Sequence, residues 1–300
     1  MTDEDLEAFE QHWTDLWTAE PIPARWVIES LLPVGLVGLV GPPKESMKST
    51  QALACAIATA GEKSSLYPEW MLSPERVHRD GDVLYVSAEA EAGELLETAL
   101  HGLGAHAGKI GGHSIYVAKN PMRYRLDEPQ AGQKRLLHAM DLIDPRLVIL
   151  DPLTRLHSSD ENDAGAMSRM MWPLRSWAVE HSACVLFVHH TRKLGVGEKT
   201  YKAQDARGTS DWQGMVDGTL TISPLEGHVQ IDTVFKRGMP WSRRLILGAF
   251  GAKAAEVLTD VDNKVLAMVD AGESAEDIAR KCKVHLSIVL EAGKKRERNR

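Results

Sequence analysis

Polar residues that can bind a metal or move a proton follow two short apolar runs in the middle of the chain. Residues 147–150 (LVIL) lead into Asp151, and residues 185–188 (VLFV) lead into His189 and His190. The segment between the two runs is long enough for a crossover helix, so this stretch predicts a parallel β-α-β unit. Ligands bind at the carboxyl edge of open α/β sheets, so we expect Asp151 and the histidines to face a common site.

A second candidate site is the sequence GPPKESMKST, which begins at Gly41 and precedes an Ala-rich helical segment. A Gly/Pro turn before a helix suits phosphate, because backbone N–H groups, a lysine and a Ser/Thr hydroxyl can bind a nucleotide and Mg²⁺. The spacing departs from GxxxxGK[ST]. Counting from Gly41 puts Met47 at the lysine position, while anchoring on Lys48 and Ser49 puts Pro42 and Met47 where the glycines belong. Either the loop has a different length or path, or the segment is a plain strand-turn-helix.

A third candidate is Glu89, which follows the strand-like run DVLYVSA (residues 82–88) and precedes a helical pattern. At a helix N-terminus, a carboxylate can simply complement the helix dipole. At the carboxyl end of a strand beside a nucleotide, it can also act as a general base or orient a water. The sequence leaves both interpretations open.

The chain is long enough, at 300 residues with 43% hydrophobic content, to bury one large core with a small additional domain. None of its apolar runs is long enough to cross a bilayer, and its N-terminus is acidic where a signal peptide would be basic, so we expect a cytoplasmic protein with no membrane partner. Cys55, Cys184 and Cys282 form no CxxC pair, which favours buried thiols over disulfides or zinc.

The net charge of −7 is unevenly distributed. Residues 1–20 contain seven acidic side chains and neither lysine nor arginine, so the remainder is neutral and can carry basic patches. Two such patches are residues 192–207 and the C-terminal sequence KKRERNR. The acidic segment, residues 1–22, has apolar residues at helical spacing and predicts an amphipathic helix that packs either on its own domain or on a neighbouring subunit.

The C-terminal part changes character after an expected linker at residues 251–257. Residues 258–300 predict a small helix-turn-helix-like domain with a basic tail, in which Ser274 caps one helix. A second helix beginning near His285 would enter the major groove of duplex DNA, but it offers few side chains that could read bases. A bundle that docks on a replication protein explains the pattern equally well.

The runs DVLYVSAE, LVILDPLTRLHSSDENDAG and VLFVHHTRK, in this order, resemble RecA-like hexameric replicative helicases of the plasmid RepA type and related phage and plasmid ATPases. The similarity covers residues 23–250. The expected phosphate loop is the part of this range that differs from the family's pattern. The resemblance implies a RecA-like P-loop NTPase core with a central, mostly parallel sheet. It also implies assembly as a homo-oligomeric ring, a hexamer, with ATP bound between subunits. The segment DARGTSDWQGMVD also resembles a DnaB-type motif.

The resemblance also implies roles for individual residues. Lys48 would bind the phosphates of ATP, Ser49 and Asp151 would hold Mg²⁺, Glu89 would orient the attacking water, and His190 would sense the γ-phosphate, with His189 as the adjacent alternative. The whole nucleotide-binding set would be Gly41, Lys44, Lys48, Ser49 and Thr50.

Further lysine and arginine side chains are expected to act at subunit interfaces or to contact DNA. Lys236 or Arg237, in the turn between two strand-like segments, would reach the neighbour's nucleotide, and Arg207 would lie near the nucleotide or the DNA loop. A solvated turn is the alternative for the first two. Two loops with glycines and excess positive charge suit a single-stranded DNA backbone, with Tyr201 available for stacking. Their candidate DNA-binding residues are Arg155, Arg192, Lys193, Lys199 and Lys202.

Together these features favour an ATP-dependent motor, a replicative helicase of a plasmid, phage or mobile element that moves on single-stranded DNA. One alternative on the same fold is a recombination or repair ATPase. Another is a nucleotide-gated DNA-binding regulator that hydrolyses ATP poorly because its phosphate loop is irregular. Fold analogy does not choose among the three.

Overall fold

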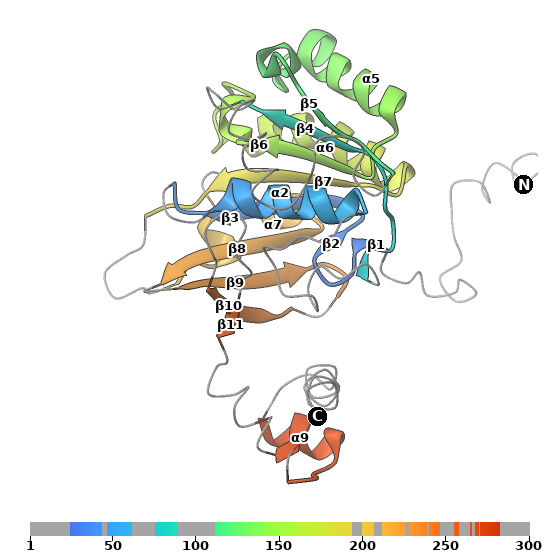
Figure 1. Ribbon diagram of the computed structural model, residues 1–300. Coiled ribbons are helices and arrows are strands. Elements are labelled where there is room, and N and C mark those ends of the chain that lie inside the picture. Colours follow the sequence, from blue (N-terminus) through green and yellow to red (C-terminus); the bar gives the residue numbers. More distant parts are fainter. Residues whose placement is uncertain are drawn as a thin grey trace, which may run out of the picture.

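The computed structural model covers the whole chain, and its placement is described for the following residues: 25–43, 47–61, 76–88, 112–193, 200–206, 212–225, 228–238, 240–246, 255–257, 265, 268–269 and 271–282. Figure 1 draws the rest as a thin grey trace.

One large sheet runs through the described part of the chain, with strands in the order β11-β10-β9-β8-β3-β7-β6-β4-β5. The six strands from β8 to β5 are mutually parallel, and β9, β10 and β11 continue the sheet as antiparallel strands. The parallel strands are β3 (Gly35–Gly41), β4 (Val83–Ser87), β5 (Ile115–Val117), β6 (Leu147–Asp151), β7 (Cys184–His190) and β8 (Gly218–Leu225). The antiparallel ones are β9 (His228–Phe235), β10 (Ser242–Ile246) and β11 (Ala255–Val257). This mostly parallel sheet confirms the predicted fold class.

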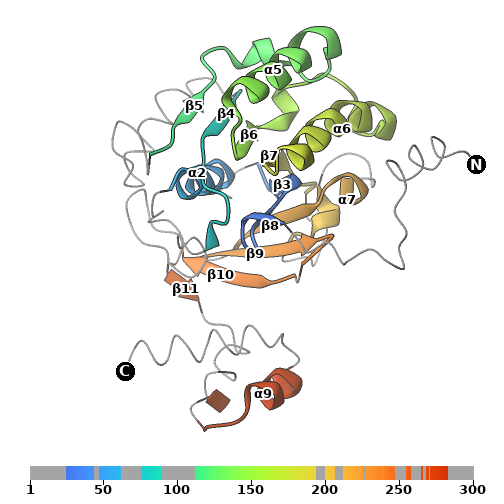
Figure 2. The same ribbon diagram turned by 90° about the vertical axis from the view of Figure 1, so that its right-hand side faces the viewer.

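Helices cover both faces of the sheet, which is why the central strands are continuous apolar runs. Figure 2 shows α2 (Lys48–Thr59) on one face, and α5 (Lys134–Ile143) and α6 (Ala164–Glu180) on the other. Asp163 caps α6 by accepting a hydrogen bond from the backbone N–H of Ala166 at 3.0 Å. The remaining short elements are β1 (Trp26–Ile28), β2 (Leu32–Pro33), η2 (Pro121–Tyr124), η3 (Pro129–Gln133), η4 (Leu153–Arg155), η5 (Ala203–Asp205) and α7 (Trp212–Met215).

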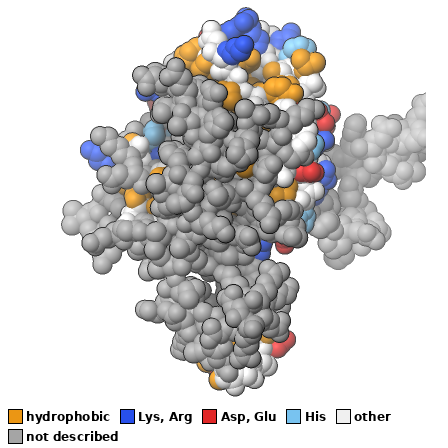
Figure 3. Space-filling view, viewed as in Figure 1, with side chains coloured by type: hydrophobic (Ala, Val, Ile, Leu, Met, Phe, Trp, Pro, Cys, Tyr) orange, Lys and Arg blue, Asp and Glu red, His pale blue; other side chains and the backbone are white. Residues whose placement is uncertain are grey.

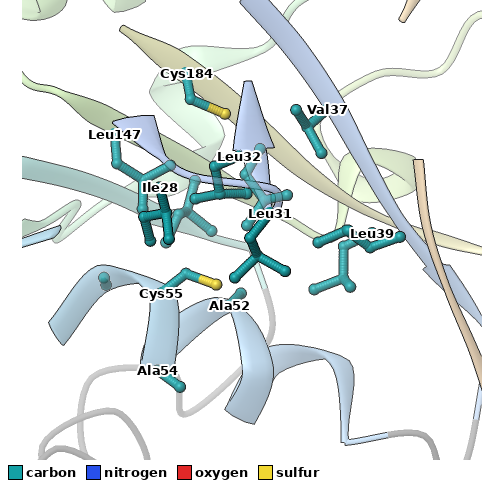
Figure 4. Close-up of a cluster of buried hydrophobic side chains, with 14 of the residues drawn as sticks. Ile28, Leu31, Leu32, Val37, Leu39, Ala52, Ala54, Cys55, Leu147 and Cys184 are labelled. Carbon is teal, nitrogen blue, oxygen red and sulfur yellow. The ribbon is translucent and has the colours of Figure 1, made fainter. Parts of the chain in front are cut away.

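The core beneath α2 depends on small residues in that helix. Figure 4 shows Ala52 and Cys55 of α2 on the side that faces Leu147 and Cys184 of the sheet. Alanine has a high helix propensity and a small volume, so α2 both forms readily and lies close to the strands. Burial raises the pKa of the Cys55 thiol to about 12 and raises that of Cys184 well above its ordinary value, so both thiols stay protonated and inert.

The sheet extends into the segment expected to be a linker, because β11 pairs with β10 through Ala255 to Val257. Beyond it, α9 (Ala275–Cys282) begins as predicted, with the Asp277 backbone N–H donating to Ser274 Oγ at 3.2 Å. Val265 and Ile278 form a small separate apolar cluster there. The expected amphipathic helix before residue 25 and the helix near His285 lie outside the described residues. No helix among the described residues has the length and apolar composition to cross a membrane.

Candidate nucleotide site at the carboxyl edge of the sheet

Four strand ends converge at one edge of the sheet. In the register of β3 and β7, Gly41 is opposite His190, and in the register of β4 and β6, Ser87 is opposite Asp151. The ladder continues one residue further at both places: the Thr191 backbone N–H donates to the Gly41 carbonyl at 3.0 Å, and the Ala88 N–H donates to the Asp151 carbonyl at 2.7 Å. The parallel β-α-β arrangement predicted from the sequence is therefore present, with both strand ends at a common edge.

Strand alternation decides which of the two histidines faces the phosphate loop. The even-numbered apolar residues of β7 pack in the core cluster that contains α2, and the odd-numbered ones pack in the cluster on the other face. Successive side chains of a strand point to opposite faces, so His190 lies on the α2 side and the fully buried His189 on the other. The same rule puts Asp151 on the α2 side, because Leu147 and Ile149 pack there.

The phosphate loop reaches α2 through a left-handed residue. Met47 has φ 50° and ψ 32°, and α2 begins directly after it at Lys48. Glycine adopts a left-handed conformation most easily, and the second glycine of GxxxxGK[ST] stands directly before the lysine. Met47 therefore has, directly before Lys48, a backbone conformation that favours glycine. Of the two ways to align the loop, the one anchored on Lys48 and Ser49 therefore fits. Lys48 is buried and its Nζ donates to the Pro42 carbonyl, whereas the side chain of Ser49 is exposed.

The oxygen ligands at this edge suit Mg²⁺. Asp151 is 3% exposed and is the last residue of β6, and Ser49 lies in the first turn of α2. Mg²⁺ in nucleotide sites is bound by one or two protein oxygens together with substrate phosphates, so a single carboxylate and a hydroxyl form a sufficient protein contribution. The residues that the structure describes hold no cluster of three or more His, Cys, Asp or Glu that could bind a metal ion.

The segment after β6 is held by a network that the sequence did not reveal. Asp127 accepts hydrogen bonds from Arg125 Nη2 at 2.7 Å and from the Ser158 N–H and Oγ, both at 2.7 Å. Burial raises the pKa of Asp127, but these hydrogen bonds outweigh it and hold the pKa well below its usual range. Asp127 therefore anchors the turn that carries Arg155, whose side chain is exposed.

The basic segment after β7 folds back on itself. Arg192 Nη2 lies 2.8 Å from Asp205 Oδ1, and the Lys202 backbone N–H donates to Asp205 Oδ2 at 2.8 Å. Thr191 and Ala206 form an isolated antiparallel bridge at the base of the same loop. The buried Asp205 thus closes the loop and neutralises Arg192, while Lys193 and Lys202 stay exposed.

The predicted interface cations lie at the opposite edge of the sheet. The turn after β9 carries Lys236 and Arg237, and β9 ends beside Gly218, the first residue of β8. Together with Arg25 and Arg175 they line a pocket of about 220 Å³. They are thus remote from the phosphate loop of their own subunit.

Asp217 organises this pocket. Its carboxylate accepts hydrogen bonds from Arg175 Nε at 2.8 Å and Nη2 at 2.7 Å, and from the Leu36 N–H at 3.0 Å. A side chain at Gly35 would begin 2.3 Å from Asp217 Oδ2, so only glycine fits there. Burial lowers the pKa of Lys236, whose Nζ donates to the Gly214 carbonyl at 2.7 Å. Arg237 is exposed and makes no hydrogen bond or ion pair with the residues that the structure describes.

Comparison with known proteins identifies the family and the fold of the chain. A sequence model of an AAA domain matches residues 3–196, which is more than half of the chain. The chain belongs to the AAA domain family. Among solved structures, this AAA domain is similar to the RadB recombinase, with a TM-score of 0.50 and 15% identity over 75% of this chain and 92% of that one. The likeness agrees with a RecA-like fold, as the order of the strands in the sheet does.

The AAA domain brings together only part of the residues predicted from the sequence. Gly41, Lys48, Ser49, Asp151 and His190 lie along the carboxyl edge, with Thr50 next to Ser49 in the first turn of α2. Residues Lys44, Glu89, Lys199 and Arg207 lie outside the described residues. Sequence reasoning missed Tyr85, Asp127 and Asp217, which act through contacts with residues far away in the chain. Their polar character within or next to apolar runs was the available signal.

The conformation of Met47 in the AAA domain leads to a prediction about stability. A left-handed backbone costs a non-glycine residue on the order of 1–2 kcal/mol, and more for a β-branched one. We expect Met47→Gly to keep or raise the free energy of unfolding, and Met47→Val to lower it by about 2 kcal/mol. Urea denaturation measures both. Equal stability of the valine variant and the wild type would contradict the left-handed conformation.

A second prediction concerns His157, which is buried in the segment that follows β6 and η4. Burial lowers its pKa below 6.5, outweighing the opposite influence of Glu161 and Asp127. The unfolded chain therefore binds a proton more readily than the folded AAA domain, and stability falls as the pH drops below about 6.5. We expect His157→Gln to flatten the pH dependence of the unfolding free energy between pH 7 and 5. The exposed His138→Gln serves as control, and an unchanged slope in His157→Gln would refute the assignment.

Proposed function

We propose that the chain is an ATP-dependent DNA motor, a ring-forming replicative helicase of a plasmid, phage or mobile element that moves on single-stranded DNA. The observation that carries the proposal is the division of charged groups between two edges of one sheet. A phosphate loop, a carboxylate and a histidine share the carboxyl edge, while exposed cations line a pocket at the other edge. A complete hydrolytic site then requires two copies of the chain.

In this proposal the carboxyl edge binds and positions the nucleotide. Backbone N–H groups at the start of α2 and the Lys48 ammonium hold the phosphates, and Ser49 with Asp151 holds Mg²⁺. Bound Mg²⁺ would neutralise charge on the phosphate oxygens. Glu89 would orient the attacking water, and His190 would report the presence of the γ-phosphate to β7 and to the basic loop that follows it. His190 suits this role because it faces α2 while its strand leads directly into Arg192.

The neighbouring subunit would supply the remaining positive charge. Arg237 is the stronger candidate, because it is exposed and without a partner among the described residues, whereas Lys236 is engaged by the Gly214 carbonyl. A cation placed against the transferred phosphate stabilises charge that develops in the transition state. This arrangement would couple hydrolysis to contact between subunits.

Single-stranded DNA would bind near the turns that follow β6 and β7. Arg155, Lys193 and Lys202 are exposed there and can contact phosphates without breaking an internal ion pair. Arg192 would contribute less, because Asp205 already neutralises it. The proposal assigns Lys199 and Arg207 to the same surface on the basis of their sequence positions.

A recombination or repair ATPase is a second candidate, and the similarity to the RadB recombinase favours it. It would use the same nucleotide site but would form filaments or annealing complexes on DNA without separating strands. The third possibility is a nucleotide-gated DNA-binding regulator that hydrolyses ATP poorly. The supporting feature is the absence of glycine from the sequence of residues 42–47, directly before Lys48.

Assembly mass and unwinding of a forked DNA duplex, both with ATP and Mg²⁺, separate these functions. The motor predicts a closed oligomer of defined mass and strand separation that requires ATP hydrolysis. A continuous distribution of large assemblies without unwinding would favour the recombinase. A monomer whose DNA binding is lost when residues 258–300 are removed would favour the regulator.

A further inference from the structure

A buried tyrosine contacts the carboxylate of the candidate metal site. Tyr85 lies in the middle of β4, is 1% exposed, and packs in the core cluster that contains α2. Its hydroxyl donates a hydrogen bond to Asp151 Oδ2 at 2.7 Å. That distance is in the range of strong hydrogen bonds between a hydroxyl and a carboxylate. The two side chains therefore form a charge-assisted pair beneath the nucleotide site.

The geometry of the sheet explains why a tyrosine is suited to this contact. Tyr85 pairs with Ile149 on the neighbouring strand, and Asp151 lies two residues further along that strand on the same face. Two residues of a strand span about 6.6 Å, which a tyrosine side chain leaning along the strand can cover. A serine or threonine at this position would be too short, and a phenylalanine would fill the core equally well but offer no donor. Packing alone thus does not account for the hydroxyl.

We propose that Tyr85 is a positioning residue for Asp151. By holding Oδ2 it fixes the rotation of the carboxylate, so that Mg²⁺ or a water bound to Mg²⁺ would contact a carboxylate oxygen at a fixed position. Partners of metal ligands orient those ligands, and their removal weakens metal affinity by roughly 10-fold to 100-fold. This inference rests on the proposed assignment of Asp151 to Mg²⁺ in a nucleotide site.

The test is the Mg²⁺ dependence of nucleotide binding, measured at equilibrium with a fluorescent ADP analogue and full-length protein. We expect Tyr85→Phe to raise the Mg²⁺ concentration at half-maximal enhancement about 10-fold, with unchanged affinity for the analogue in the absence of Mg²⁺. Leu84→Ala is the matched control, because Leu84 lies on the same strand but packs on the other face of the sheet. It should lose stability and keep the wild-type Mg²⁺ midpoint.

A double-mutant cycle with Asp151→Asn separates the inference from the proposed function. Tyr85→Phe should have no further effect on the midpoint when Asp151 is already asparagine. A wild-type midpoint in Tyr85→Phe, together with a shifted midpoint in Asp151→Asn, would overturn the positioning role and leave the metal site standing. Wild-type midpoints in both variants would overturn the metal site itself. An equal shift in Leu84→Ala would assign the effect to lost stability and also overturn the positioning role.

Discussion

Lys48→Ala is expected to lower the rate of ATP hydrolysis by at least about 100-fold, because removing a single preorganised donor from developing charge costs this much in other enzymes. Lys48 is the first residue of α2. Among the described residues 41–43 and 47–48, it is the one with a charged side chain. The polyanionic phosphates need such a cation beside the backbone N–H groups of the helix. Nucleotide affinity should fall as well, since part of the contact exists before the transition state.

The exposed Lys134→Ala on α5 is the matched control, because it removes the same side chain far from any proposed site. It should retain full activity. Circular dichroism and thermal unfolding would establish that Lys48→Ala is folded, since Lys48 is buried and bonds the Pro42 carbonyl. Full hydrolytic activity in a folded Lys48→Ala variant would eliminate the loop as the phosphate site.

Arg237→Ala is expected to bind nucleotide with nearly wild-type affinity but to hydrolyse it on the order of 10³-fold more slowly, as when other ATPases and GTPases lack the arginine that reaches a neighbour's phosphate. Arg237 lies at the edge of the sheet opposite its own phosphate loop. It can therefore act only on a nucleotide held by a second subunit. Steady-state hydrolysis and equilibrium binding of an ATP analogue measure the two effects separately.

Mixing variants tests the assignment across the interface. Subunits with Arg237→Ala and subunits with Lys48→Ala should regain activity together, because some interfaces then combine an intact loop with an intact arginine. Arg135→Ala, which removes an exposed arginine from α5, is the control for loss of charge alone. Absence of regained activity in assemblies that contain both variants would place Arg237 outside the catalytic interface.

The parallel sheet and the common edge at which its strands end were predictable from the sequence, because both depend on local patterns. Continuous apolar runs that end in Asp151 and His190 specify parallel strands buried on both faces, and their carboxyl ends must meet at one edge. The cap at Ser274 was predictable for the same reason, since a hydroxyl before a helix with acidic residues in its first turn is a local signal.

Figure 3 shows the exposed end of the molecule around α5, where lysine and arginine side chains lie beside hydrophobic ones, and no motif in the sequence marked that surface.

The features that were not predicted depend on tertiary contacts or on a backbone conformation that the residue type does not indicate. Met47 adopts a left-handed conformation that its side chain disfavours, and the residue type gives no signal for this backbone conformation. Asp217 and Asp127 hold distant segments in place, and their partners are separated from them by tens of residues. The choice between His189 and His190 required the identity of the face on which α2 packs.

The most direct test of this account is the rate of ATP hydrolysis by the full-length protein with Mg²⁺, in the presence and absence of single-stranded DNA. A DNA motor of this kind should hydrolyse ATP several-fold faster when single-stranded DNA is present, at a protein concentration where the chain is oligomeric. Hydrolysis that DNA leaves unchanged, by a protein that stays monomeric with nucleotide bound, would contradict it.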